Sequence, residues 1–253
     1  MSKIYTLFLQ NLFRVMKRLP VLKDSVITIP NGPNKGKKFI VNSDSFYASG
    51  QYEADSVMKM LDIIKDDDIV YDIGANMGYY SMAFSDCCKQ VYAFEPLPKN
   101  LEIVEQHIAE NNINNVDIFP YAITDEDKTL IFTSSQGTAS NTYKTDSETF
   151  QSASNTIEVE GKSLDNLVLN GEIPPPNFIK IDVEGAELDL LHGAEKVLLK
   201  YKPAVVVATH DMVIPGIKDK CLAFLDKVNY KYSKTSDLKD NVGLEDYFAF
   251  PKS

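Results

Sequence analysis

The stretch YDIGANMGYYS, residues 71–81, decides the fold, because it joins a buried strand to a glycine turn and the start of a helix. The apolar run at 69–73 predicts the strand, and Gly74 and Gly78 can take backbone angles that other residues resist. Asp72 stands near the end of this strand. Since ligands of open α/β sheets bind beyond the carboxyl ends of the strands, the stretch predicts a ligand-binding turn.

A second acidic residue indicates what the turn binds. The run VYAFEP, residues 91–96, ends the next predicted strand with Glu95, where a carboxylate can accept both hydroxyls of a ribose. Nicotinamide dinucleotides and S-adenosylmethionine (SAM) both use this arrangement. The turn lacks the third glycine of the G-x-G-x-x-G pattern, so no pyrophosphate needs to lie on the helix N-terminus. This favours SAM.

Strand and helix patterns alternate through the middle of the chain. Apolar runs predict buried parallel strands at 69–73, 91–94, 116–121, 178–181 and 204–208. Helical periods lie at 79–84, 99–111, 186–199 and 217–228. This alternation predicts a doubly wound, Rossmann-like α/β sheet. The last two strands, NYKYSKTS at 229–236 and EDYFAFP at 245–251, have no helix between them, which predicts an antiparallel hairpin at the sheet edge, as in class I methyltransferases.

The segments before this core predict an N-terminal extension. DSVITIP at 24–30 and KKFIVNS at 37–43 read as a small antiparallel pair, and 52–64 as a helix that leads into the first buried strand. We expect residues 1–45 to form the extension and residues 46–253 the cofactor-binding domain. The Ser/Thr/Asn/Gln-rich stretch 133–156 is either a surface loop or a lid over a binding site.

Residues 1–20 predict an amphipathic helix that ends at Pro20. The segment contains basic residues and no acidic ones, and Gln10 and Asn11 interrupt its apolar stretch, so it is a poor signal peptide. We expect the helix to pack on its own domain or on a second subunit. The alternative is a helix lying on an anionic membrane surface, which would make the protein peripheral at the membrane.

Composition limits the other classes of function. Of the 253 residues 44% are hydrophobic and 25% are charged, as in ordinary soluble globular proteins, and no apolar run approaches the ~20 residues of a membrane helix. The net charge of −10 argues against a nucleic-acid partner. Cys87, Cys88 and Cys221 show neither zinc spacing nor a disulfide framework, which favours a reducing compartment and a cytoplasmic location.

Three motifs, in this order, resemble the FkbM family of SAM-dependent methyltransferases: DIGANMGYYS at 72–81, FEPLP at 94–98 and IKIDVEGAELDLLHGAEKVL at 179–198. The resemblance covers roughly residues 40–250. It implies a class I methyltransferase that methylates hydroxyl groups, often on sugars of glycans, glycolipids or natural products. The acceptor would then be a glycan or a carbohydrate-containing small molecule.

The resemblance also implies positions for the parts of the cofactor. Asp72, Gly74, Asn76, Gly78 and Ser81 would surround its methionine and ribose. Glu95 would hold the ribose hydroxyls, while Pro96 and Ala122 would lie beside the adenine ring. Glu53 would approach from the preceding helix. Apart from the resemblance, the position of Asp182 at the end of the fourth predicted strand predicts that it faces both cofactor and acceptor.

The candidate catalytic residues lie at the ends of the fourth and fifth predicted strands. A sugar hydroxyl is a poor nucleophile, so a general base is expected, and His210 and Asp182 are the candidates. His210 is predicted to be neutral at rest, with an ordinary pKa of about 6.5, or else to have no proton role. The family commonly has a Glu just before this His, where this chain has Ala208-Thr209.

Two further expectations concern metal binding and the other histidines. Asp182, Glu184, His210 and Asp211 offer oxygen and imidazole ligands that suit a divalent cation. His107 and His192 lie on predicted helices and are expected at the surface.

The sequence therefore predicts a SAM-dependent O-methyltransferase that acts on a sugar hydroxyl. Two alternatives stay open: an NAD-dependent oxidoreductase, and a non-catalytic binding protein on a methyltransferase fold.

Overall fold

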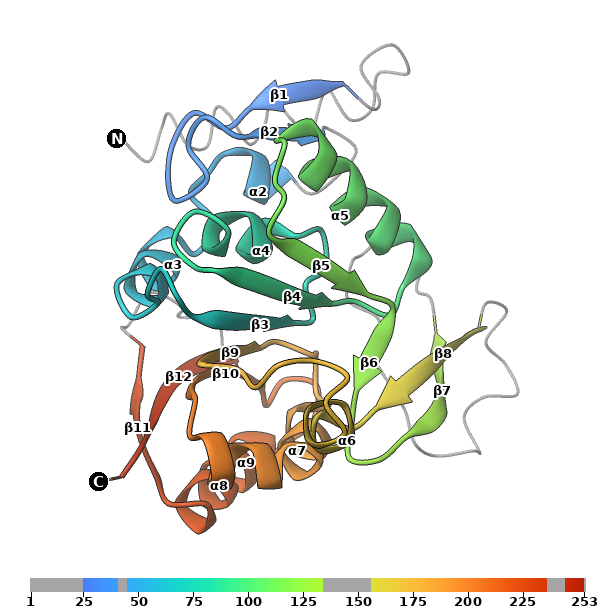
Figure 1. Ribbon diagram of the computed structural model, residues 1–253, viewed down its shortest axis with the longest axis vertical. Helices are drawn as coiled ribbons and strands as arrows, with labels where there is room; N and C mark the ends of the chain where they lie inside the picture. The colour runs from blue at the N-terminus through green and yellow to red at the C-terminus, as the bar shows by residue number, and fades with distance from the viewer. Residues whose placement is uncertain (1–24, 41–44, 134–155, 236–243, 253) are drawn as a thin grey trace.

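A seven-stranded, mostly parallel sheet lies at the centre of the protein (Figure 1). The computed structural model describes residues 25–40, 45–133, 156–235 and 244–252. The strand order is β11-β12-β10-β9-β3-β4-β5. The bounds are β3 Ile69–Ile73, β4 Gln90–Phe94, β5 Val116–Phe119, β9 Phe178–Ile181, β10 Ala204–His210, β11 Tyr230–Lys234 and β12 Leu244–Pro251. β12 runs antiparallel to both of its neighbours, β10 and β11, and the other pairings of this sheet are parallel, so the predicted Rossmann-like sheet with a reversed last strand is confirmed.

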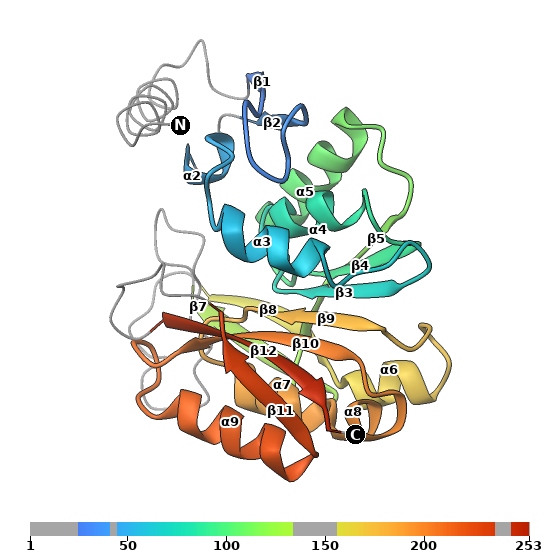
Figure 2. The same ribbon diagram turned by 90° about the vertical axis from the view of Figure 1, so that its left-hand side faces the viewer.

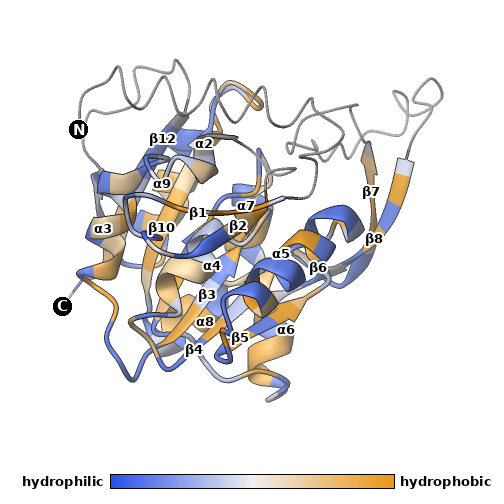
Figure 3. Cartoon of the chain, turned by 90° about the horizontal axis from the view of Figure 1, so that it is seen from above, coloured by the Kyte–Doolittle hydropathy of each residue, from blue (hydrophilic) through white to orange (hydrophobic). Residues whose placement is uncertain are grey.

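Helices cover both faces of this sheet (Figure 2). One layer holds α3 (Ala54–Leu61), α4 (Tyr79–Phe84) and α5 (Pro98–Glu110). The other holds α6 (Leu164–Leu169), α7 (Glu187–Gly193), α8 (Glu195–Tyr201) and α9 (Ile217–Lys227). Figure 3 shows β10 largely hydrophobic, whereas hydrophilic and hydrophobic turns alternate along α5. A strand buried on both faces and a helix buried on one face produce these two patterns.

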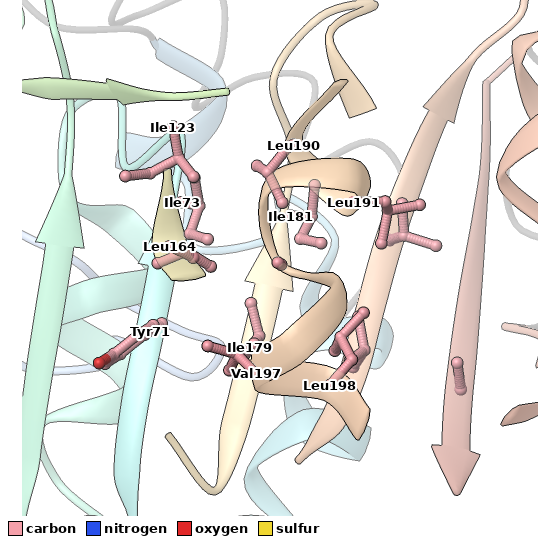
Figure 4. Packing of buried hydrophobic residues seen from close by; sticks show 14 of the residues in the cluster. Tyr71, Ile73, Ile123, Leu164, Ile179, Ile181, Leu190, Leu191, Val197 and Leu198 are labelled. Atoms are coloured by element: carbon pink, nitrogen blue, oxygen red, sulfur yellow. The ribbon is translucent and has the colours of Figure 1, made fainter. Parts of the chain in front are cut away.

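Alternate residues of the central strands enter two separate cores. Tyr71 and Ile73 of β3, with Ile179 and Ile181 of β9, pack beneath α7 and α8 (Figure 4). Val70 and Phe178 point the other way and pack with residues of α3 and α4. This two-sided burial explains why the strands are continuous apolar runs. Because β3, β4, β9 and β10 run parallel, their carboxyl ends lie at one edge of the sheet.

The structure corrects the prediction of one strand over 116–121. Pro120 has no N–H to donate, and the chain divides there into β5 and β6 (Tyr121–Ile123). β6 leaves the central sheet and joins β7 (Lys128–Thr133) and β8 (Thr156–Lys162) in a three-stranded sheet of order β6-β8-β7. The polar segment expected to be a loop or lid falls largely at 134–155, outside the described residues.

The predicted helix at 186–199 is two helices, α7 and α8, which meet at Ala194. A Cβ on Gly193 would lie 1.9 Å from the carbonyl oxygen of Thr124, so the chain passes too close for a larger residue. The carboxylate of Asp165 accepts hydrogen bonds from the backbone N–H groups of Lys196 and Val197 at the start of the second helix. These contacts stabilise a new helix start.

The N-terminal extension forms the predicted antiparallel pair, β1 (Val26–Thr28) and β2 (Lys38–Ile40), followed by the short α2 (Ser45–Ala48). The predicted amphipathic helix at 1–20 lies outside the described residues. Within the described ranges, no helix is long and apolar enough to cross a membrane.

His192 is exposed as predicted, but the prediction of a surface position for His107 is wrong. His107 is fully buried, because β2 packs over the face of α5 that carries it, and the ring of Phe39 stacks on the imidazole with centroids 4.3 Å apart.

Candidate active site

A cavity opens at the carboxyl ends of β3, β4, β9 and β10, with β6, β7 and the start of α3 completing its wall. Several of the predicted site residues line it: Glu53, Gly74, Asn76, Glu95, Pro96, Ala122, Asp182 and His210. Asp72, Gly78 and Ser81 are not among its lining residues. The structure therefore brings together residues from six separate parts of the sequence.

The glycine turn forms one wall of the cavity and depends on a close approach of two chain segments. Gly74 has φ +78°, and a Cβ there would lie 1.9 Å from the carbonyl oxygen of Asp182. Asn76 is also left-handed, with φ 52°, a conformation that Asn tolerates better than most residues. Its side-chain oxygen Oδ1 is buried and has no hydrogen-bond partner among the described residues. A buried acceptor of this kind is a group that a bound ligand would satisfy.

Asp72 supports this turn from behind and does not face the cavity. It is fully buried, its Oδ2 accepts a hydrogen bond of 2.6 Å from the Ser81 hydroxyl, and its Oδ1 lies 3.3 Å from Nζ of Lys180. Lys180 Nζ also lies 3.5 Å from Asp182 and donates to the carbonyl oxygen of Gly74. Burial alone would lower the pKa of Lys180, but Asp72 and Asp182 raise it above its ordinary value. Lys180 therefore stays an ammonium that joins β9 to the turn.

Glu95 is a buried carboxylate held by three donors. Its Oε2 accepts from the N–H of Asn76 at 2.9 Å, and its Oε1 accepts from the N–H of Leu97 at 2.9 Å and from Asn100 at 3.2 Å. Burial raises the pKa of Glu95 to about 7, against the lowering effect of these donors. Additional hydroxyl donors would favour the ionised form, because hydrogen bonds to the charged form lower a pKa.

A cluster of tyrosines forms the wall nearest the N-terminal extension. Tyr47 packs with ring centroids 4.5 Å from Tyr52 and 5.1 Å from Tyr79. The Tyr80 hydroxyl donates to the carboxylate of Glu53, which precedes α3 in a left-handed conformation. The cavity thus offers aromatic faces beside a fixed carboxylate.

His210 lies among three carboxylates at the end of β10. Its Nδ1 is 2.6 Å from Oε1 of Glu187, and its Nε2 is 3.4 Å from Asp182 and 3.6 Å from Glu184. Burial alone would lower the pKa of His210, but Glu187, Asp182 and Glu184 raise it to about 9. The prediction of an ordinary, neutral His210 at rest is therefore wrong, because these carboxylates stabilise the imidazolium.

Glu187 was not predicted as a site residue. It is fully buried at the start of α7, and it supplies the carboxylate that Ala208-Thr209 cannot supply before His210. Its position one turn after the end of β9 is the signal that could have identified it. The left-handed backbone of Glu184 and Gly185 turns the chain so that Glu187 points back to β10.

Three of the four candidate cation ligands come together. The ligand atoms of Asp182, Glu184 and His210 all lie within 4.8 Å of one another. Asp211 does not join them, since its carboxylate accepts from the N–H of Lys218 at the start of α9. Two carboxylates and one imidazole are a ligand set compatible with a divalent cation.

Comparisons with known proteins agree with this geometry. The sequence model of the family described as "Methyltransferase FkbM domain" matches residues 72–232. The hexuronic acid methyltransferase AglP of Haloferax volcanii is 29% identical over 171 residues, which cover 68% of this chain and 68% of that protein.

Two solved structures share the fold. Methyltransferase FkbM from Methylobacillus flagellatus KT superposes with a TM-score of 0.51 at 16% identity, covering 73% of this chain and 44% of that one. TYW2 of M. jannaschii, in complex with AdoMet, gives a TM-score of 0.50 at 15% identity, covering 86% of this chain and 82% of that one.

Proposed function

The chain belongs to the FkbM methyltransferase family, and we propose that this SAM-dependent methyltransferase transfers the methyl group to a hydroxyl of a sugar. The acceptor is a glycan, a glycolipid or another carbohydrate-containing molecule. One observation carries the proposal: a histidine bonded to a buried carboxylate, His210 with Glu187, lines the cavity at the strand ends. The family assignment decides against an NAD-dependent oxidoreductase and against a binding protein without catalysis.

The cavity lining supports a definite placement of the cofactor. Glu95 would accept hydrogen bonds from the ribose hydroxyls, and the adenine ring would lie between Pro96 and Ala122. The methionine part would pass Gly74, which lines the cavity, and Asn76, whose Oδ1 has no partner among the described residues. This placement leaves Asp182 and His210 on the side from which an acceptor can approach the methyl group.

His210 would act as the general base for the acceptor hydroxyl. At rest the ring is an imidazolium, which cannot accept a proton. Bound SAM would bring a positive sulfonium near the site, and a like charge lowers the pKa of a histidine. The neutral ring would then take the hydroxyl proton at Nε2, while the acceptor oxygen bonds to the methyl carbon and the methyl–sulfur bond breaks to leave S-adenosylhomocysteine. Glu187 stabilises the imidazolium that forms. Such a base contributes ~100- to 10,000-fold, and in-line placement of the two reactants contributes further.

A second candidate product is a methyl ester. The relative AglP is a hexuronic acid methyltransferase, and a hexuronic acid carries a carboxyl group besides its hydroxyls. A carboxylate is already ionised and needs no base, so the His210–Glu187 pair favours a hydroxyl acceptor. The carboxylates of Asp182, Glu184, Glu53 and Glu95 outnumber the cations of Lys180 and His210 in the cavity lining and disfavour a further anion beside them.

A divalent cation would fit the same cluster. Asp182, Glu184 and Nε2 of His210 would hold it, and it would polarise the acceptor oxygen as a Lewis acid. Glu187 would then orient the histidine through Nδ1, an arrangement common around metal-bound histidines. Dialysis against EDTA separates the two mechanisms. Full activity after dialysis supports His210 as the base, and loss that Mg²⁺ restores supports the cation.

The proposed function is tested with SAM that carries a tritiated methyl group. The full chain is incubated with this cofactor and with separate glycan, glycolipid, protein and nucleic-acid fractions of cells. Label should enter a carbohydrate-containing fraction, and the His210→Asn variant should transfer far less to it. Transfer only to protein or nucleic acid would contradict a sugar acceptor.

A further inference from the structure

His107 has a defined chemical form because of its two partners. Its Nδ1 lies 2.8 Å from the carbonyl oxygen of Met77, and its Nε2 lies 3.0 Å from the backbone nitrogen of Ile40. A carbonyl oxygen can only accept, so Nδ1 carries the hydrogen. The Ile40 N–H can only donate, so Nε2 carries none. The ring is thus the neutral Nδ1–H tautomer, and burial agrees by lowering the pKa of His107 to about 4.

The partner of Nδ1 lies in the middle of the glycine turn. Met77 stands between Asn76, with φ 52°, and Gly78, with φ 77°. Left-handed residues on both sides of Met77, one of them a non-glycine residue, form a turn that the surrounding structure must hold in place. Asn76 is fixed on its other side, since its N–H donates to Glu95. The hydrogen bond from His107 fixes the carbonyl of the next residue.

The N-terminal extension holds the same region through further contacts. The buried side chain of Asn34 donates to the carbonyl oxygen of Tyr79 at 2.8 Å, and Lys37 Nζ donates to that of Met82. Through Ile40, the His107 ring also joins β2 to this set. The carbonyls of the glycine turn and of α4 are therefore held by side chains that come from α5 and from the extension. Figure 1 shows α5 and the strands of the extension on the same side of the molecule as α4.

We propose that His107 is a positioning residue for the cofactor, acting through the Met77 carbonyl. This inference rests on the proposed placement of SAM beside the glycine turn. His107 does not line the cavity, so it acts by holding the turn in the shape that presents Gly74 and Asn76 to the cofactor. Loss of its two hydrogen bonds should weaken cofactor binding without any change in groups that touch the cofactor.

Three variants separate positioning from packing. His107→Phe keeps a flat ring against Phe39 and removes both hydrogen bonds, whereas His107→Gln keeps one donor and one acceptor. The matched control is Asn111→Ala, on the same helix. It removes the paired hydrogen bonds of Asn111 with the backbone of Lys38, at 2.7 and 2.9 Å, and its hydrogen bond of 2.8 Å to the backbone carbonyl of His107, but it leaves the His107 ring and its bond to Met77 in place. Affinity for S-adenosylhomocysteine is measured by calorimetry on each full-length protein.

His107→Phe should raise the dissociation constant roughly three- to tenfold, the effect of losing about one hydrogen bond. His107→Gln should recover much of this loss, and Asn111→Ala should stay near the wild type. Equal affinities of wild type and a folded His107→Phe would overturn the inference. So would an equal loss in Asn111→Ala. If the wild type itself bound no S-adenosylhomocysteine, the placement of the cofactor would be wrong instead.

¹⁵N NMR of the wild-type protein labelled with ¹⁵N-histidine gives a test that needs no variant at His107. The ring should show a protonated Nδ1 and an unprotonated Nε2, and the Nδ1–H signal should move when S-adenosylhomocysteine is added. A signal that stays in place while the cofactor product binds would overturn the inference, even if both His107 variants failed to fold.

Discussion

Oε1 of Glu187 lies 2.6 Å from Nδ1 of His210, and both side chains are buried. The carboxylate comes from the first turn of α7 and the imidazole from the end of β10. The histidine therefore has a fixed orientation, with Nδ1 toward Glu187 and Nε2 toward Asp182 and Glu184, which line the cavity. The carboxylate partner of the histidine comes from another element, not from Ala208 or Thr209 just before it.

Glu187→Gln should lower the pKa of His210 from about 9 toward its ordinary value, because the substitution removes one of the negative charges that raise it. Turnover should fall roughly tenfold or more, since the imidazolium formed during transfer loses its partner. NMR titration measures the pKa, and an assay at saturating substrates measures turnover. Affinity for S-adenosylhomocysteine should hardly change. An unaltered His210 pKa would show that the pair has no electrostatic role.

Activity should rise with pH, because His210 is an imidazolium at rest and must lose a proton before it can accept one. In the free protein, Glu187 and the other two carboxylates raise the pKa of His210 to about 9 against the lowering effect of burial. In the cofactor complex it should be lower, owing to the sulfonium charge. The measurement is kcat/KM for the acceptor at saturating SAM, from about pH 6 to about pH 10. A flat profile together with an active His210→Asn variant would remove His210 from the mechanism.

Cofactor binding should depend on the ionisation of Glu95. Burial raises the pKa of this side chain to about 7 in the free protein, and ribose hydroxyls would favour the carboxylate. Affinity for S-adenosylhomocysteine should therefore fall as the pH drops below about 7, and binding near neutral pH should release protons. Calorimetry in two buffers of different ionisation enthalpy counts the protons released.

Glu95→Gln should weaken binding by about 1.5–3 kcal/mol, the range for hydrogen bonds to a charged group, and should remove the pH dependence. Glu102→Gln is the matched control, because this side chain lies exposed on α5, away from the cavity lining. Equal affinities for the wild type and Glu95→Gln would show that Glu95 does not hold the ribose.

Gly74→Ala should destabilise the fold more than Gly171→Ala. Both glycines have nearly the same left-handed φ, +78° and +76°, so both substitutions carry the same backbone cost of about 1–2 kcal/mol. At Gly171 a Cβ would meet open space, whereas at Gly74 it would lie 1.9 Å from the Asp182 carbonyl oxygen. Urea unfolding measures the difference, which should exceed ~2 kcal/mol if the two segments cannot separate. Equal losses would mean that the turn can move away from β9.

The sequence predicts the central sheet well, because its strands are local apolar runs and because Gly74 and Gly78 mark the glycine turn within a few residues. Pro120 is a local signal for the break after β5, but the pairing of β6 with β8, a strand far along the chain, does not follow from any local pattern. The burial of His107 likewise depends on Phe39 and Ile40, which a distant segment brings to the helix.

Within the site, sequence position indicates which side chains stand at strand ends but not which way they face. Asp72 precedes the turn, yet it lies behind it, bonded to Ser81 and Lys180. The partnership of Glu187 with His210 depends on the left-handed backbone at Glu184 and Gly185, and no local pattern predicts that geometry. The shift in the His210 pKa follows from that convergence.

The nature of the methylated product tests the central claim most directly. The wild type is incubated with SAM labelled in the methyl group and with the carbohydrate fraction that accepts the label. The purified product is then treated with mild alkali, which hydrolyses methyl esters and leaves methyl ethers intact. A sugar-hydroxyl methyltransferase should give label that stays on the carbohydrate, and His210→Asn should form little of it. Label released as methanol would show transfer to a carboxylate and contradict the role of His210 as the base for a hydroxyl.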